Sequence, residues 1–339
     1  MHFKIPSFTS SVVGIVVVVA ATVQVASSAP LGTRQTIDDA TVLNYALTLE
    51  HIENAFYSGA LAKFDAQAFL QAGLPSDARG RFEQIAAHEK AHVDFLTSAL
   101  GNKATKACVY DLNLNIYAVI PWHETNIISA PLLPGYFAAR DPYTDVNSFV
   151  ALSKLFEGVG VSAYTGAAQL ITNKAYLTAA ASVLSTEARH ASWVASAIGK
   201  VNPWSGPLDV PLSLNEVFSL VAPSIVSCPS TNPALPVKAF PALTLNKVAP
   251  GKKMSVHHDH HHGHATQKDA SGSTFIAFLS GLDTTFVPIE DGHIVVPEWL
   301  RGQVYAVATS SATEASDATI LAGPAVLQFD FGADGELIE

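Results

Sequence analysis

The 339-residue chain is poor in charged residues, in cysteine and in long apolar runs. Only 14% of its residues are charged and 49% are hydrophobic, which excludes a disordered chain and predicts a sizeable buried core. The formal net charge of −10 disfavours a nucleic-acid-binding surface, so no nucleic acid is expected as a partner. No segment resembles a nucleophilic triad, a phosphate-binding loop or a nucleotide fingerprint, and those classes of enzyme are not indicated.

The one long apolar run stands near the start of the chain. Lys4 precedes apolar residues 12–23, and small residues follow at 26–29. This pattern predicts a secretory signal peptide over residues 1–29, and the alternative is a transmembrane anchor. Because no second run is long enough to span a bilayer, we expect a soluble, secreted, extracellular protein without stable membrane insertion.

The chain has only two cysteines, Cys108 and Cys228. In an oxidising compartment they are expected to form one disulfide, which links the end of the second predicted helix to the segment after the helical region. The alternative is two separate buried thiols.

Two predicted helices each carry a glutamate followed three residues later by a histidine. The pairs are Glu89 with His92 and Glu187 with His190. Three residues are just under one helical turn, so the two side chains of each pair project from the same face.

Two further predicted helices each carry a glutamate followed seven residues later by a tyrosine. The pairs are Glu50 with Tyr57 and Glu157 with Tyr164, and each tyrosine precedes a hydroxyl residue, glycine and alanine. This internal repeat predicts two helix hairpins related by an approximate two-fold axis. The tyrosines could donate hydrogen bonds to carboxylates or lie near a radical path, and the alternative is ordinary core packing.

Two Glu-x-x-His helices and two single-glutamate helices make up the ligand set of a di-metal carboxylate four-helix bundle. Four carboxylates would be neutralised by two divalent cations. Oxygen-rich ligation with one imidazole per metal suits iron or manganese best, and zinc would also fit. The alternative is a set of surface charges at helical spacing. The predicted metal ligands are Glu50, Glu89, His92, Glu157, Glu187 and His190.

Three polar residues flank the predicted ligands. Glu53 lies one turn beyond Glu50 and could be an extra ligand or the true one, so it joins Tyr57 and Tyr164 as a candidate supporting residue. His51 and His88 each adjoin a ligand but point elsewhere on their helices, and we interpret them as rim or core polar groups.

The predicted helices run from about 37 to 63, 76 to 100, 146 to 172 and 175 to 200, with short ones at 66–72 and 213–221. The helical region is residues 37–228. Residues 103–145 have no helical period and four prolines. They are either the long crossover of a four-helix bundle, or they include a stretch within 112–140 that comes from a mis-annotated gene.

Composition changes after Cys228. Residues 229–244 form a proline-rich linker, and residues 245–339 contain short β-rich runs at 273–279, 293–296, 303–309 and 325–331. These runs predict a small antiparallel β-sandwich of about seven strands. The expected fold class is therefore α+β with two domains.

A histidine-rich tract interrupts this β region and holds six of the 13 histidines. We expect an exposed loop that either binds zinc, copper or nickel or is simply solvated. The secondary metal candidates are His257, His258, His260, His261, His262 and His264.

The order of the helical motifs resembles the ferritin-like superfamily, including its rubrerythrin and bacterioferritin relatives. The segments LNYALTLEHIENAFY, AAHEKAHVDFL, FEGVGVSAYTGAAQLI and TEARHASWV are most similar to secreted fungal ferritin-like proteins, described as stress-response or desiccation-related. The resemblance covers about residues 37–228 and implies a di-iron-type site at the six predicted ligands. The long 103–145 segment departs from it, and the β region carries no such resemblance.

Three functions are compatible with these residues. The first is an oxidoreductase that handles dioxygen or peroxide in stress protection. The second is a non-catalytic extracellular protein that binds metal ions. The third is a structural surface protein, in which the bundle is a scaffold and the β region contacts polysaccharide or another protein. Candidate partners include the cell wall and another copy of the chain. A closed storage cage is disfavoured because the β region would crowd its shell.

Overall fold

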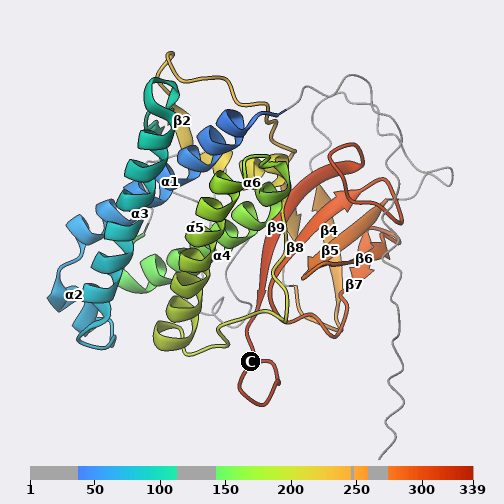
Figure 1. The fold of residues 1–339 in the computed structure, drawn as a ribbon. Coiled ribbons are helices and arrows are strands. Elements are labelled where there is room, and N and C mark those ends of the chain that lie inside the picture. The colour runs from blue at the N-terminus through green and yellow to red at the C-terminus, as the bar shows by residue number, and fades with distance from the viewer. Residues whose placement is uncertain (1–36, 113–142, 246–247, 259–273, 339) are drawn as a thin grey trace, which may run out of the picture. The chain divides into compact units, whose positions relative to one another are not determined.

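The computed structural model describes residues 37–112, 143–245, 248–258 and 274–338 (Figure 1). The predicted signal peptide at 1–29, nearly all of the 112–140 segment and the later part of the histidine tract lie outside the described residues. From Ile37 onward the chain forms one compact unit. Within the described residues, no helix has the length and apolar character needed to cross a membrane.

Four long helices form two antiparallel hairpins, in which α1 packs on α3 and α4 packs on α5. Short 3₁₀ turns follow α3 and α4, and a π-helical segment, Val194–Ile198, follows α5. The positions predicted for all six helices are confirmed to within a few residues. The helices are α1 Asp39–Lys63, α2 Ala66–Gln71, α3 Ala78–Leu100, α4 Val146–Ala167, α5 Lys174–Trp193 and α6 Leu214–Val221.

Side-chain caps fix where several helices begin. The Asp38 carboxylate accepts a hydrogen bond from the Thr41 N–H at 2.8 Å at the start of α1. Asp145 makes a capping box with Ser148 at the start of α4, and Ser213 starts α6 in the same way. Such caps satisfy N–H groups that have no partner inside the helix, and each stabilises its helix by about 1 kcal/mol.

Aromatic side chains fill the bundle between the hairpins. Phe56 of α1, Phe82 of α3 and Phe149 of α4 are fully buried. The Phe82 and Phe149 ring centroids lie 4.8 Å apart, and those of Phe56 and Phe149 lie 5.3 Å apart. This apolar packing ties the two hairpins together on the side of the bundle where α2 lies.

The C-terminal region contains two antiparallel sheets, with strand orders β6-β5-β8-β9 and β3-β4-β7. Apolar residues of both sheets share one core, so the seven strands form the predicted sandwich. A separate antiparallel pair is formed by β1, in the segment that follows α3, and β2, in the segment that follows α6. The strands are β1 Val109–Tyr110, β2 Ile225–Ser227, β3 Leu243–Leu245, β4 Lys253–His258, β5 Phe275–Ser280, β6 Asp283–Pro288, β7 His293–Val295, β8 Gly302–Thr309 and β9 Ile320–Phe329.

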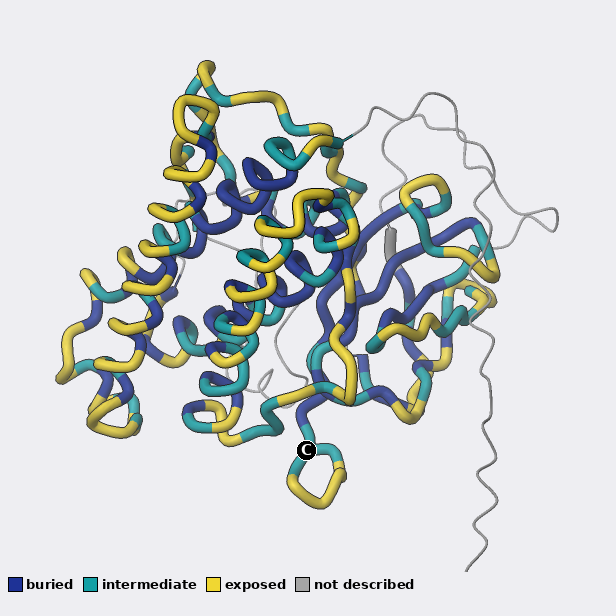
Figure 2. The backbone as a smooth tube through the Cα atoms, in the orientation of Figure 1, coloured by how far each residue is buried: buried dark blue, intermediate teal, exposed yellow. Residues whose placement is uncertain are grey.

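The four-stranded sheet is covered on both faces. One face packs on the three-stranded sheet. The opposite face packs on the bundle, since its residues Leu279, Tyr305 and Val326 belong to the bundle's core. The Tyr305 hydroxyl donates to Gly158 O at 3.2 Å and lies 2.9 Å from the Ser162 hydroxyl, both on α4. Figure 2 shows β8 and β9 buried along most of their length. The bundle and the sandwich thus share a core, while the division at 229–244 into domains stays a prediction.

The structure confirms the predicted disulfide and changes the prediction for the start of the histidine tract. Cys108 and Cys228 form the predicted disulfide, beside the β1–β2 pair. The histidine tract does not begin as a loop: His257 and His258 end β4, where they pair with Thr244 and Leu243. Alternation with the apolar residues Met254 and Val256 extends the strand into the tract, and the loop prediction was wrong for these two residues.

Candidate metal centre

Each of the four long helices contributes acidic or histidine side chains to one buried cluster. Glu50 comes from α1 and Glu157 from α4, while α3 and α5 each contribute a glutamate and a histidine. The four carboxylates are between 0% and 1% exposed, although ionised carboxylates are seldom buried without a partner. The structure therefore brings all six predicted ligands together: Glu50, Glu89, His92, Glu157, Glu187 and His190.

The six residues form two overlapping groups, each able to hold one ion. The first contains Glu50 and His92, and the second contains Glu157 and His190. Glu89 and Glu187 belong to both groups, and the ligand atoms of each group lie within 4.8 Å of one another. The two groups of possible ligands therefore overlap, because they share two carboxylates.

Each histidine directs its Nδ1 atom toward the carboxylates. His92 Nδ1 lies 3.3 Å from Glu50 Oε2, 3.1 Å from Glu89 Oε2 and 3.1 Å from Glu187 Oε1. His190 Nδ1 lies 3.2 Å from Glu89 Oε1 and from Glu157 Oε2. Adjacent ligands of an octahedral ion with bonds of about 2.1 Å stand about 3 Å apart, so these separations suit shared coordination.

Several of these buried atoms lack a hydrogen-bond partner in the described part of the chain. They include Glu50 Oε2, Glu157 Oε2, Glu89 Oε1, both oxygens of Glu187 and His190 Nδ1. A buried polar atom without a partner destabilises a fold by about 1–3 kcal/mol. Metal cations would supply partners for such atoms, since carboxylate oxygens and imidazole nitrogens are common metal ligands.

The two repeat tyrosines hydrogen-bond across the bundle. Tyr57 on α1 donates to Glu157 Oε1 on α4, and Tyr164 on α4 donates to Glu50 Oε1 on α1 at 2.5 Å. Each tyrosine therefore holds one oxygen of a single glutamate and leaves the other oxygen, Oε2, facing the histidine. The predicted hydrogen bonds from tyrosine to carboxylate are confirmed, and both rings are also buried in the core.

Glu53 is buried beside the cluster but belongs to neither group of possible ligands. It lies near Glu187, since a Cβ atom added at Gly160 would stand 3.0 Å from Glu53 Oε1 and 3.4 Å from Glu187 Oε2. Burial, and then the negative charges of Glu187 and Glu50, raise the pKa of Glu53 well above its usual value. The geometry favours Glu50 as the ligand and leaves Glu53 as a neighbouring acid.

Three of the four carboxylates, those of Glu50, Glu157 and Glu187, have a pKa above that of an exposed glutamate, because they are buried. For Glu89, burial is outweighed by its contacts with His190 and His92, which lower its pKa. Burial raises the pKa of Glu50 to about 7 and that of Glu187 well above its ordinary value. Burial alone would lower the pKa of His92, but the nearby carboxylates of Glu187, Glu50 and Glu89 raise that pKa to about 12. The same balance raises the pKa of His190 to about 10. Cations binding here would therefore displace protons.

His88 takes part in the site, although its position beside Glu89 led us to interpret it as a peripheral polar group. Its Nδ1 atom lies 2.9 Å from Nε2 of His190. His51, its counterpart beside Glu50, instead bonds Thr105 O at 3.2 Å. The signal that could have identified His88 is its spacing of four residues from His92, which places both on one side of α3.

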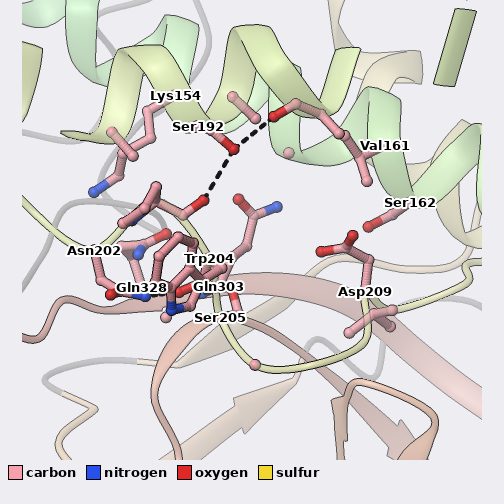
Figure 3. A pocket seen from close by; sticks show the side chains of 18 of the residues that line it. Lys154, Val161, Ser162, Ser192, Asn202, Trp204, Ser205, Asp209, Gln303 and Gln328 are labelled. Carbon is pink, nitrogen blue, oxygen red and sulfur yellow. Dashed lines mark hydrogen bonds between the residues drawn. The ribbon is translucent and has the colours of Figure 1, made fainter. Parts of the chain in front are cut away.

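A separate cavity of about 140 Å³ lies between α4, α5 and the sheet (Figure 3). Its lining includes Ser162, Trp204, Gln303 and a single carboxylate, that of Asp209. Lys154 also lines it, and its Nζ atom is paired with Asp330 at 2.8 Å. With one acid and no histidine in its lining, this cavity is a poorer metal site than the buried cluster.

Comparison with known proteins agrees with the fold and the site. Residues 38–200 match the family model described as a ferritin-like domain. This match covers the four helices that carry the cluster. Residues 38–200 are therefore described as a ferritin-like domain.

One similar protein is "Protein rds1" of the fission yeast Schizosaccharomyces pombe. The two sequences are 26% identical over 203 residues, which are 60% of this chain. The aligned region spans 43% of the yeast protein's own length. The likeness therefore supports a fungal ferritin-like relationship and leaves the activity to be inferred from the site.

Proposed function

We propose that this chain is a secreted protein with a di-iron or di-manganese centre that reacts with dioxygen or peroxide in stress protection. The observation that carries the proposal is the pair of overlapping Glu/His groups that share Glu89 and Glu187. Shared carboxylates hold two ions close together, which is the arrangement required for two metals to act on one small molecule.

The residues of the centre have separate roles in this proposal. When bound, the ion pair would supply the electrons that dioxygen or peroxide accepts. Glu89 and Glu187 would contribute to holding both ions, while Tyr57 and Tyr164 orient Glu157 and Glu50 through hydrogen bonds. The aromatic core around Phe56 and Phe149 keeps bulk water away, which strengthens electrostatic interactions inside the bundle.

The decisive experiment is elemental mass spectrometry of the secreted protein from its native host. We expect about two iron or manganese atoms per chain, as the two groups of ligands require. A Glu89→Ala/Glu187→Ala variant should lose both atoms, and a variant lacking 257–264 should keep them. Metal that disappears only with the histidine tract would refute the bundle site, and metal-loaded protein without oxygen or peroxide turnover would refute the oxidoreductase.

A second candidate function is metal binding without catalysis. The observation that favours it is the burial of the cluster: the four carboxylates and His190 are buried, His92 is only 12% exposed, and none of the six residues lines the cavity of Figure 3. Two metals retained without reaction with dioxygen or peroxide would support this function over the first.

Secretion rests on two independent features. The N-terminal pattern over 1–29 is that of a signal peptide, and the Cys108–Cys228 disulfide suits an oxidising compartment. Sequencing the N-terminus of protein recovered from culture medium tests this proposal. A mature chain that begins near residue 30 is expected, and protein confined to the cells with an intact leader would contradict it.

A further inference from the structure

The two histidines of the centre differ in what lies behind them. His190 uses Nδ1 to face Glu89 and Glu157, and its opposite ring nitrogen, Nε2, contacts Nδ1 of His88 at 2.9 Å. His92 also faces the carboxylates with Nδ1, but its Nε2 has no hydrogen-bond partner among the described residues. The two groups of ligands are therefore alike in composition, but only His190 has a side chain in contact with its Nε2 atom.

The contact between His88 and His190 determines which nitrogen of His190 carries the proton. A histidine that binds a metal through Nδ1 must present the lone pair of that atom, so its proton resides on Nε2. That proton can then be donated to Nδ1 of His88. The two rings are parallel to within 10°, so the hydrogen bond can lie in the planes of both.

The same contact restricts rotation of the His190 ring. The His190 side chain is 7% exposed, and its Nε2 contacts His88, which is itself exposed on α3. The His92 side chain is 12% exposed, so water is the available partner for its Nε2. Water follows a moving ring, whereas a side chain on a helix holds the ring in one orientation.

We propose that His88 makes the two metal positions inequivalent: it positions His190, so the Glu157/His190 position binds the first ion and the Glu50/His92 position the second. This inference rests on the proposed di-metal centre. His88 is a positioning residue, because it acts through His190 and faces no ion position itself. Hydrogen-bonding partners of metal-bound histidines commonly change metal affinity by about 10- to 100-fold.

Calorimetric titration of the metal-free full chain with Mn²⁺ tests the proposal. The wild type should show two binding steps of different affinity. His88→Ala should weaken the first step at least about tenfold and leave the second unchanged, because only the first depends on His190. His88→Gln should restore the first step, since its amide oxygen can accept the Nε2 proton.

His51→Ala is the matched control, because His51 also adjoins a ligand glutamate but bonds Thr105 O instead. It should bind Mn²⁺ as the wild type does. Thermal unfolding of all metal-free variants checks that each is folded. A second readout is the absorption spectrum with one equivalent of Co²⁺, which should show a single species in the wild type and a mixture in His88→Ala.

The outcomes separate this inference from the proposed function. A wild type that binds no metal would defeat the di-metal centre itself. Two equal steps in the wild type, or an unchanged first step in His88→Ala, would overturn the role of His88 while leaving the centre intact.

Discussion

The two helix hairpins are alike at the centre and different around it. In each hairpin, a glycine two residues after the repeat tyrosine allows a residue from later in the chain to pack closely against the helix. A Cβ atom at Gly59 would stand 2.8 Å from the Tyr143 hydroxyl, and one at Gly166 would stand 1.8 Å from Leu212 O. Tyr143 donates to Phe56 O at 3.1 Å, and the Leu212 N–H donates to Ser162 O at 3.2 Å.

Both hairpins carry the same kinds of Glu/His residues and a closely packed glycine, but the residues that contact each glycine differ. The first hairpin meets a side chain at its glycine, whereas the second meets the backbone that leads into α6. The second hairpin also bears the sheet, through Ser162 and Tyr305. The two hairpins are therefore symmetric in their Glu/His cluster and differ in the residues around it.

The largest effect should come from separating shared from unshared ligands. We expect Glu89→Ala to abolish binding of both ions, because Glu89 belongs to both groups. Glu50→Ala should lose one ion only, since it belongs to a single group. Metal atoms per chain, measured by elemental mass spectrometry, distinguish the two variants. Equal losses would mean that the groups are not shared as the geometry indicates.

Metal affinity should rise with pH between about 6 and 8. Glu50 has a folded-state pKa raised to about 7 by burial, so below that pH an ion must displace its proton. Each displaced proton changes the affinity by about tenfold per pH unit. Mn²⁺ titrations in buffers of different ionisation enthalpy measure the protons released. Affinity that is constant over this range would contradict the protonated cluster.

The metal-free protein should show the opposite trend. A raised folded-state pKa gives stability that is complete below the unfolded value and is lost as pH rises through the folded value. Glu50, with its folded pKa of about 7, therefore makes the metal-free chain less stable at pH 8 than at pH 6. The raised histidine pKa values act in the same direction. Thermal unfolding with and without Mn²⁺ compares the two trends.

The paired glycines should differ in their tolerance of alanine. Gly166→Ala forces a methyl group into the Leu212 backbone and should destabilise the fold by about 3 kcal/mol or more. Gly59→Ala meets only the end of the Tyr143 side chain and should cost about 1–2 kcal/mol. Urea denaturation measures both. A larger loss for Gly59→Ala would reverse the comparison between the hairpins.

The smallest and most symmetric effect should come from the tyrosines. Tyr57→Phe and Tyr164→Phe each remove one hydrogen bond to a single glutamate. We expect each to weaken one Mn²⁺ site by about tenfold, since such bonds orient a ligand without replacing it. Titration calorimetry of the two single variants and the double variant checks this. Additive losses are expected, because each tyrosine supports a different position.

The parts of the molecule that sequence alone predicts are those fixed by local spacing. The helices and the Glu-x-x-His pairs depend on residues within a turn or two of each other. The ligand set follows from that spacing because each pair lies on one helical face. Its repeat order then indicates which helices must meet.

The parts that escaped prediction depend on contacts between distant segments. The role of His88 requires α3 and α5 to be placed side by side. Strand β9 begins at Ile320, whereas the sequence predicted a start at 325. The prediction was late because Pro324 lacks an N–H group and interrupts the sequence pattern of a strand. Strands β3, β4 and β6 were not predicted. A short segment such as Leu243–Leu245 carries little periodic signal.

The Cys108–Cys228 bond makes the second hairpin part of a covalent ring. The bond joins residues 120 positions apart, and α4 and α5 both lie between them. A protease that cuts the chain once anywhere inside the ring would therefore release nothing. The nicked molecule would run as one species on a non-reducing gel and separate into two fragments only after reduction. The two hairpins that carry the Glu/His cluster would therefore stay covalently linked after such a cut.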